Sequence, residues 1–237
     1  MPRSPWRSRR RTSRRESKGR QTRRGVRYRS SIKEVAKNEK SLLLLNQQLG
    51  DANAAEIAED LKSNAFLERL SLDENEIGDE GAIAIAEALK SNNVLKYLDL
   101  SINNIGNAGA TALASALLIN SSVTKLSLEN NNIGDAGATA IAEALKSNNS
   151  MQFLNLGSNY IGDQGAIAIA EALKVNDSLK YLDLNRYKIG DKGAKALASA
   201  LRVNDSLKIL SVSGMDLAAA YHSQLAAACE EKGVRLM

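Results

Sequence analysis

Residues 67–94 read LERLSLDENEIGDEGAIAIAEALKSNNV, and this 28-residue pattern is written across the chain about seven times. It recurs without insertion from Leu95, Val123, Met151 and Leu179, and in a more divergent form from Glu39 and Leu207. A fixed period of this length is typical of a solenoid, in which each unit stacks on the next. The repeat therefore predicts one continuous body rather than a set of separate globular domains.

Each unit is predicted to form a strand, a turn, a helix and a second turn. With Leu67 counted as position 1, apolar residues stand at positions 1, 4 and 6, and the alternation through positions 4 to 6 is strand spacing. Ile85, Ala86 and Leu89 have the spacing of the inner face of a helix. Asp at position 13, here Asp79, is expected to cap the helix that it begins, because its carboxylate can accept hydrogen bonds from free backbone N–H groups.

Identical units in register place each strand beside its counterpart. The predicted fold is a curved α/β solenoid with a parallel β-sheet on the concave face and helices on the convex face, because helices are wider than strands. We expect a disordered, Arg- and Ser-rich basic tail over residues 1–30 and a repeat domain over 31–237. Within that domain we expect a cap helix at about 31–40, repeats at about 39–206 and a C-terminal cap at about 207–237.

The consensus LxxLxLxxNxIGDxGAxAIAxAL resembles the leucine-rich repeats of the ribonuclease-inhibitor-like class over about residues 39–237. Proteins with similar repeats include the ribonuclease inhibitors, the Ran GTPase-activating proteins and the sensor regions of NOD-like receptors. The resemblance implies a horseshoe that binds proteins, without identifying the protein bound. Ribonuclease inhibitors are rich in cysteine, whereas Cys229 is the only cysteine here, and the chain has no GxxxxGK[ST] nucleotide-binding motif.

The strand side chains that point away from the core form the predicted binding surface. Positions 4 and 6 point into the core, so positions 3, 5 and 7 point out of the concave sheet. Aromatic residues at position 3 beside acidic neighbours resemble the composition of protein interfaces. The competing interpretation is a solvated sheet face whose aromatic rings pair across strands. The predicted partner-binding residues are Arg69, Asp73, Tyr97, Asp99, Lys125, Glu129, Phe153, Asn155, Tyr181 and Asp183.

Asparagine at position 9 has a structural interpretation, because an amide can satisfy both the donors and the acceptors of a buried turn. The predicted ladder consists of Asn75, Asn103, Asn131 and Asn159. Tyr187 takes this place in the sixth repeat and predicts a local defect. The sequences Asn-x-Ser at Asn120, Asn148, Asn176 and Asn204 match the N-glycosylation pattern, but their 28-residue spacing marks them as repeat turns.

We predict no catalytic residues, no metal site and no cofactor. His222 and Cys229 are the only residues of their kinds, and one such pair cannot form a metal cluster. Seven residues on a helix separate them by roughly 10 Å along its axis, which disfavours a Cys–His nucleophile pair.

The charge of the chain is divided unevenly. The net charge is +5, but residues 1–30 contain twelve Arg and Lys18 against Glu16, so the tail carries +12 and the remainder −7. Such a tail fits a nucleic-acid contact, a nuclear or organellar targeting signal, or an inert solvated segment. A further hypothesis is that it folds back onto the acid-lined concave face. We expect no secretory signal and no membrane span, and a cytoplasmic location unless the tail directs the chain to the nucleus or an organelle.

These features predict a non-enzymatic scaffold or sensor that binds a protein partner on its concave face. A basic partner would complement the acidic columns of that face. One alternative is a regulator that activates a small Ran-like GTPase. Another is nucleic-acid binding through residues 1–30.

Overall fold

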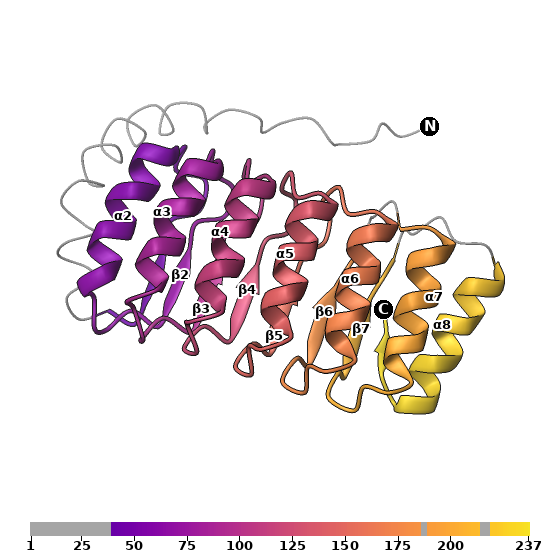
Figure 1. Cartoon of the computed structure of the whole chain (residues 1–237). Coiled ribbons are helices and arrows are strands. Elements are labelled where there is room, and N and C mark those ends of the chain that lie inside the picture. Colours follow the sequence, from indigo (N-terminus) through magenta and orange to yellow (C-terminus); the bar gives the residue numbers. More distant parts are fainter. Residues whose placement is uncertain (1–38, 186–188, 214–218) are drawn as a thin grey trace, which may run out of the picture.

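The computed structural model describes residues 39–185, 189–213 and 219–237 of the chain. The basic tail expected over 1–30, almost all of the cap helix expected at 31–40, and Tyr187 lie outside these residues. Within them, short strands alternate with helices from one end to the other (Figure 1).

The strands are β1 (Ser41–Leu43), β2 (Arg69–Ser71), β3 (Tyr97–Asp99), β4 (Lys125–Ser127), β5 (Phe153–Asn155), β6 (Tyr181–Asp183), β7 (Ile209–Ser211) and β8 (Arg235–Leu236). The helices are α2 (Asp51–Ser63), α3 (Asp79–Leu89), α4 (Asn107–Leu117), α5 (Asp135–Leu145), α6 (Asp163–Leu173), α7 (Asp191–Leu201) and α8 (Ala219–Lys232). The last helix and the last strand fall in the segment where the sequence departs from the consensus.

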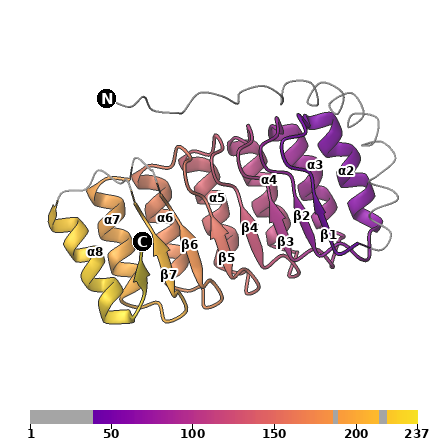
Figure 2. The same cartoon turned by 180° about the vertical axis from the view of Figure 1, so that it is seen from behind.

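The eight strands of the described residues form one parallel sheet whose spatial order is the order of the sequence. The register advances by one repeat at each step, so that Arg69 pairs with Tyr97 and Tyr97 with Lys125. Helices cover one face of the sheet, and the other face is open, as the two opposite views show (Figures 1 and 2). The predicted solenoid with a parallel sheet is confirmed.

The core is a continuous column of leucine, isoleucine and alanine between the sheet and the helices. Leu70 enters it from β2 and Leu72 from just after that strand, while Ile85 and Leu89 enter it from α3, each at most 1% exposed. One repeat buries only about six large apolar side chains, each worth about 1.5–3 kcal/mol, and together they contribute less than the cost of ordering the 28 residues of that repeat. Neighbouring repeats therefore have to share their apolar faces, as the uninterrupted core cluster shows.

The acids at position 13 do not cap their own helices, so that expectation was wrong. The residue before each of the helices α2 to α7 is a glycine in extended conformation, with no side-chain cap, and Asp135 is already the first residue of α5. Its Oδ1 instead accepts hydrogen bonds from the backbone N–H groups of Gly162 (2.7 Å) and Gly165 (2.8 Å) at the start of α6. Stacking in register brings the free donors of the next helix to this carboxylate. The same contact is made by Asp51, Asp79, Asn107 and Asp163.

Gly165 is required by this close approach between helices. A Cβ atom there would lie 2.6 Å from Cγ2 of Ile161, 2.9 Å from Oδ1 of Asp135 and 3.0 Å from Cβ of Ala138. The alanine and the capping carboxylate belong to the preceding helix, so any side chain larger than hydrogen would push two repeats apart.

Two ladders of asparagine join the turns of neighbouring repeats. Nδ2 of Asn131 donates to the carbonyl oxygens of Leu100 (2.9 Å) and Leu128 (3.1 Å), and its Oδ1 accepts from the N–H of Ile105 (3.0 Å). Asn75, Asn103 and Asn159 make equivalent bonds.

The second ladder lies where each helix returns to the sheet. Nδ2 of Asn120 donates to the carbonyl oxygens of Leu89 and Asn92, both at 2.8 Å, and its Oδ1 accepts from the N–H of Val123 at 2.8 Å. Asn120 is 2% exposed and both amide hydrogens are engaged, so the folded protein cannot carry a glycan there. The remaining members are Asn92, Asn148, Asn176 and Asn204.

Among the described helices, none combines the length and the apolar character that crossing a membrane requires.

Candidate functional site on the concave face

The concave face is the open side of the sheet, formed by positions 3, 5 and 7 of each repeat (Figure 2). The leucines that alternate with these positions are buried in the core. The side chains of this face therefore contact one another or solvent, and they are free of the packing constraint that makes the core columns uniform.

Tyr97 is the centre of the first cluster on this face. Its hydroxyl group donates a hydrogen bond to Oδ2 of Asp99 at 2.8 Å, while the guanidinium carbon of Arg69 lies 4.5 Å from the centroid of its ring. The other oxygen of Asp99, Oδ1, accepts from the hydroxyl group (2.7 Å) and the backbone N–H (3.1 Å) of Ser101. Desolvation, followed by the hydrogen bond and charge of Asp99, raises the pKa of Tyr97 to about 12. The phenol is therefore a neutral donor held in one orientation.

Tyr181 is the centre of a second cluster built on the same strand sequence, Tyr-Leu-Asp. Its ring stacks on Phe153 of β5 with centroids 4.3 Å apart and planes inclined by 8°. Its hydroxyl group donates to Oδ2 of Asp183 at 3.0 Å, and Oδ1 of Asp183 accepts from the N–H of Asn185 at 2.9 Å. Desolvation and then the charge of Asp183 raise the pKa of Tyr181 to about 12.

The two clusters lie three strands apart, which is roughly 14 Å at ordinary strand spacing. The exposed side chains of Lys125 and Glu129 stand on the strand and turn between them. Oε2 of Glu129 accepts a hydrogen bond from Nδ2 of Asn155 at 3.0 Å, which connects this central region to the second cluster. The face thus offers two ordered aromatic groups with exposed charged groups between them.

The structure separates the predicted contact residues by accessibility. Arg69, Lys125 and Glu129 are exposed, and the three aromatic rings are half-buried. Asn155 and Asp183 are only 9% and 7% exposed, because neighbouring side chains of the same face cover them, although the sequence analysis expected both to be open to a partner. Phe153 and Tyr181 do pair across strands, as the competing interpretation held, and both rings stay partly exposed.

Two exposed apolar residues at the rim of this face were not among the predicted contact residues. Tyr160 is 64% exposed at position 10, where other repeats have Glu76, Asn104 and Asn132. Ile102 is 41% exposed and holds a φ of +53°, a conformation that Asn130 adopts in the next repeat. In both cases the sequence has an apolar or aromatic residue at a repeat position that is polar in the other repeats, and this difference could have identified them.

The chemistry of the described residues is limited. Residues 39–185, 189–213 and 219–237 contain no group of three His, Cys, Asp or Glu side chains that could hold a metal ion. Cys229 is buried, and desolvation raises the pKa of its thiol, which disfavours the reactive thiolate. His222 is exposed on α8.

Comparisons with known proteins identify the repeat. Residues 98–185 match the family model described as the TMOD/LMOD leucine-rich domain, and residues 63–86 and 175–198 match the leucine-rich repeat model. The solved structure of leiomodin-1 actin-binding site 2 is 26% identical with a TM-score of 0.53, covering 65% of this chain and 88% of that one. The tropomodulin C-terminal domain of Caenorhabditis elegans is 17% identical with a TM-score of 0.54, covering 63% and 92%. No curated protein sequence matches the chain. The 28-residue units of this chain are leucine-rich repeats.

Proposed function

We propose that this chain is a non-enzymatic scaffold of the ribonuclease-inhibitor-like class of leucine-rich repeats, and that it binds one protein partner on its concave face. The main support is the pair of Tyr-Asp clusters, because core packing does not require an aromatic ring at Tyr97, Phe153 or Tyr181. Their rings are held in place before binding by Asp99, Asp183 and each other. An ordered ring loses little further entropy in a complex, so its contacts contribute fully to affinity.

We further propose actin as the first partner to test. The stretch that resembles the TMOD/LMOD leucine-rich domain, residues 98–185, contains the whole second cluster and, from the first cluster, Asp99 and Ser101. The leiomodin-1 structure that resembles this chain is named as an actin-binding site. Neither comparison points to a Ran-like GTPase or to nucleic acid as the ligand.

Calorimetric titration of monomeric actin with the full chain tests both proposals. The double variant Tyr97→Ala/Tyr181→Ala should weaken binding by roughly 30-fold or more, which is the effect of losing a buried aromatic anchor. A matched control, Val175→Ala/Val203→Ala, removes two exposed side chains at the ends of α6 and α7 and should bind like the wild type. Because both targets are on the surface, the melting curve checks that each variant is folded.

The outcomes distinguish the two proposals. If the wild-type chain fails to bind actin, actin is excluded as the partner, and the same variants are then tested on a partner captured by the full chain. If a partner binds both double variants equally well, the concave face is not the binding surface. Acceleration of GTP hydrolysis by a panel of small GTPases would contradict the non-enzymatic assignment.

A further inference from the structure

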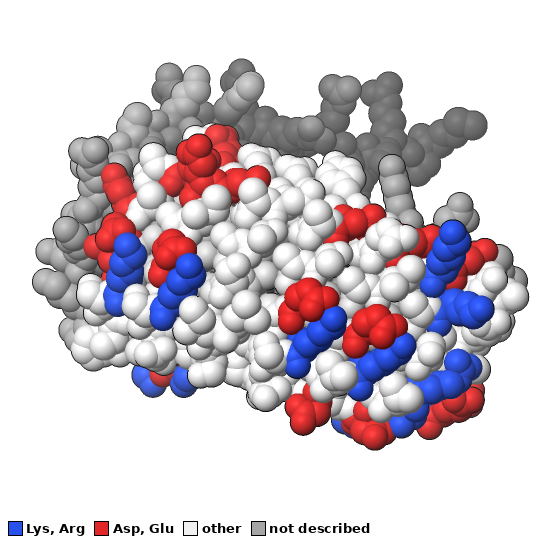
Figure 3. All heavy atoms as spheres, viewed as in Figure 1, with Lys and Arg blue, Asp and Glu red and all other residues white. Residues whose placement is uncertain are grey.

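The acidic charge of the repeats is concentrated at one end of the solenoid. Residues 51–87 contain eleven acidic and two basic residues, a net charge of −9, whereas residues 88–237 contain thirteen acidic and fourteen basic residues, a net charge of +1. Figure 3 shows carboxylates gathered at the α2 and α3 end of the helical face, where the described lysines are fewer than the acids. Residues 1–38, which come directly before the described structure, carry fifteen basic residues against two acidic ones.

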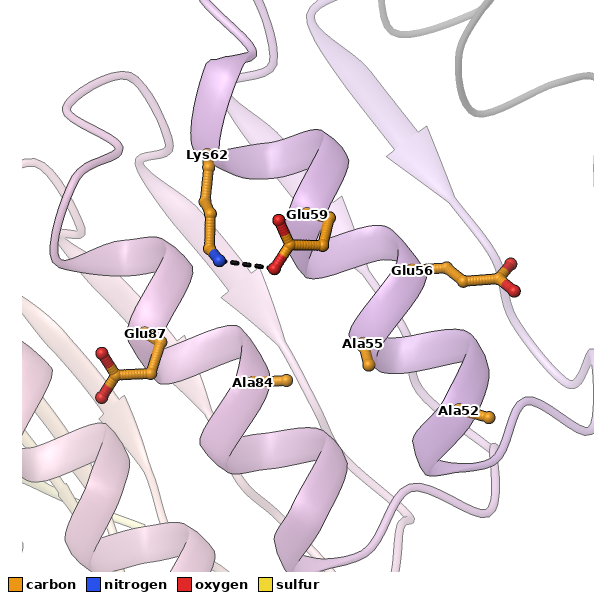
Figure 4. A pocket seen from close by; sticks show the side chains of 7 residues that line it. All are labelled: Ala52, Ala55, Glu56, Glu59, Lys62, Ala84 and Glu87. Carbon is orange, nitrogen blue, oxygen red and sulfur yellow. Dashed lines mark hydrogen bonds and ion pairs between the residues drawn. The ribbon is translucent and has the colours of Figure 1, made fainter.

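A groove lies on the helical face at the same end, between α2 and α3. It has a volume of about 390 Å³, and its apolar lining comes from Ala52, Ala55 and Ala84. Glu56, Glu59 and Glu87 line it as well, together with Lys62 (Figure 4).

Two of the three glutamates already have a lysine partner, at a distance of 2.5 Å. Lys62 pairs with Glu59, and Lys90 pairs with Glu87. Glu56 extends from the other side of α2 and has no ion-pair partner among the described residues (Figure 4). The groove and its surroundings therefore keep an excess of negative charge.

This groove arises from a local change in the repeat. Ala55 stands at position 17, where the later repeats have larger side chains, namely Ile83, Thr111, Thr139, Ile167 and Lys195. A small side chain at this position of α2 leaves the space between the two helices open. The first helix pair therefore differs from the later pairs both in the residue at position 17 and in charge.

We propose that residues 1–38 of the same chain dock on α2 and α3, with arginine stems along the alanine-lined groove and guanidinium groups on Glu56, Glu59 and Glu87. Arginine suits this surface because its aliphatic stem packs on apolar groups while its head pairs with carboxylates. The tether makes the contact intramolecular, which raises the local concentration of the basic segment far above that of a free peptide. A chain of this length can extend about 130 Å, so reach does not limit docking.

The concave face is the weaker candidate for this contact. Its acids Asp99 and Asp183 already accept hydrogen bonds from tyrosine and from neighbouring side chains or backbone N–H groups. Displacing those bonds would cost free energy, whereas Glu56 has no ion-pair partner among the described residues to displace, and the lysine pairs of Glu59 and Glu87 are exposed and weak. Docking on the helices leaves the concave face open, so the basic segment and a concave-face partner can be bound together.

The fluorescence of Trp6 can report this contact in the full chain, because Trp6 is the only tryptophan of the sequence. We would measure the fluorescence anisotropy of Trp6 and the rate of tryptic cleavage within residues 1–38, at low and high salt and at submicromolar protein. The test variants are Glu56→Gln/Glu59→Gln/Glu87→Gln, which removes the charge, and Ala55→Arg, which fills the groove. The matched controls are Glu143→Gln/Glu171→Gln, which also removes partners of lysines at the ends of helices, and Thr139→Arg at position 17 of α5.

In the wild type, anisotropy should fall and cleavage should accelerate as salt rises, because exposed ion pairs are screened. Both test variants should show the high-salt behaviour already at low salt, with cleavage faster by on the order of tenfold, as expected when several exposed ion pairs are lost together. The controls should behave like the wild type. A wild type insensitive to salt, controls affected as strongly as the test variants, or anisotropy that depends on protein concentration would each overturn the proposal.

Discussion

Two polar regions of this solenoid differ in how much their residues vary from one repeat to the next. The inter-repeat ladders, namely the two asparagine columns and the carboxylates at position 13, keep the same residue type in almost every repeat. The concave face changes its residues from strand to strand. Both consist of hydrogen-bonded polar side chains, so polarity alone does not explain the contrast.

The difference lies in what each side chain contacts. Asn131 and Asp135 bind backbone groups of the neighbouring repeat, and the backbone is the same in every unit. Tyr97 and Tyr181 bind other side chains, and those partners can change together without disturbing the stack. We conclude that the ladders maintain the solenoid and that the concave face is available for recognition.

The largest test of this contrast is Asn131→Ala. It leaves the buried N–H of Ile105 without its partner and removes one of the two asparagine hydrogen bonds to each of the carbonyl oxygens of Leu100 and Leu128. The free energy of unfolding should fall by about 3–5 kcal/mol. Urea denaturation measures the loss. Its exposed neighbour provides the control, because Asn132→Ala should change stability by less than about 0.5 kcal/mol. Equal effects of the two changes would remove the distinction between ladder and surface.

A smaller loss is expected from Gly165→Ala. The new methyl group would meet Ile161, Ala138 and the capping carboxylate of Asp135, and overpacking of this kind costs about 2 kcal/mol. The control is Gly50→Ala, because a Cβ atom at Gly50 meets nothing within 4 Å. Thermal melting of both variants measures the loss of stability. A Gly165→Ala protein as stable as the wild type would show that the helices have room to separate.

Alkaline pH should affect the concave clusters without affecting the ladders. The pKa values of Tyr97 and Tyr181 are raised to about 12 in the folded chain, above the ordinary value of 10.0. The folded state therefore favours the neutral phenols. Their contribution to stability is complete below pH 10 and is lost as pH rises through 12.

Urea midpoints measured between pH 9 and 12 follow this loss. The variant Tyr97→Phe/Tyr181→Phe should show a shallower decline than the wild type over the same range. Identical slopes for the two proteins would mean that these phenols do not contribute to the pH dependence.

The smallest effect, and a stabilising one, is expected at the rim of the concave face. Ile102 holds a left-handed φ that costs a β-branched residue about 1 kcal/mol or more, whereas asparagine tolerates it at position 130. Ile102→Asn should therefore raise the free energy of unfolding by about 1 kcal/mol, and the reciprocal change Asn130→Ile should lower it by a similar amount. If Ile102→Asn also weakens a concave-face partner, the strained isoleucine belongs to the recognition surface.

Several features of the site were predictable from the residues, and others were not. The column of Tyr97, Phe153 and Tyr181 follows from the repeat spacing, since equal positions in stacked strands must lie side by side. The contacts of these rings do not follow from the spacing. The stack of Phe153 on Tyr181 and the contact of Arg69 with Tyr97 depend on side-chain rotamers. The contact of Asn155 with Glu129, 26 residues away in the sequence, likewise depends on side-chain rotamers.

The amino-acid sequence by itself determined the period, the alternation of strand and helix, the parallel register and the leucine core, because all four repeat within one 28-residue unit. Only the tertiary structure decided that Asp135 caps α6 rather than α5, and that a groove opens between α2 and α3. Both are relations between units. A repeated pattern shows what each unit contains, but the atoms that meet across the boundary are set by how closely two units stack.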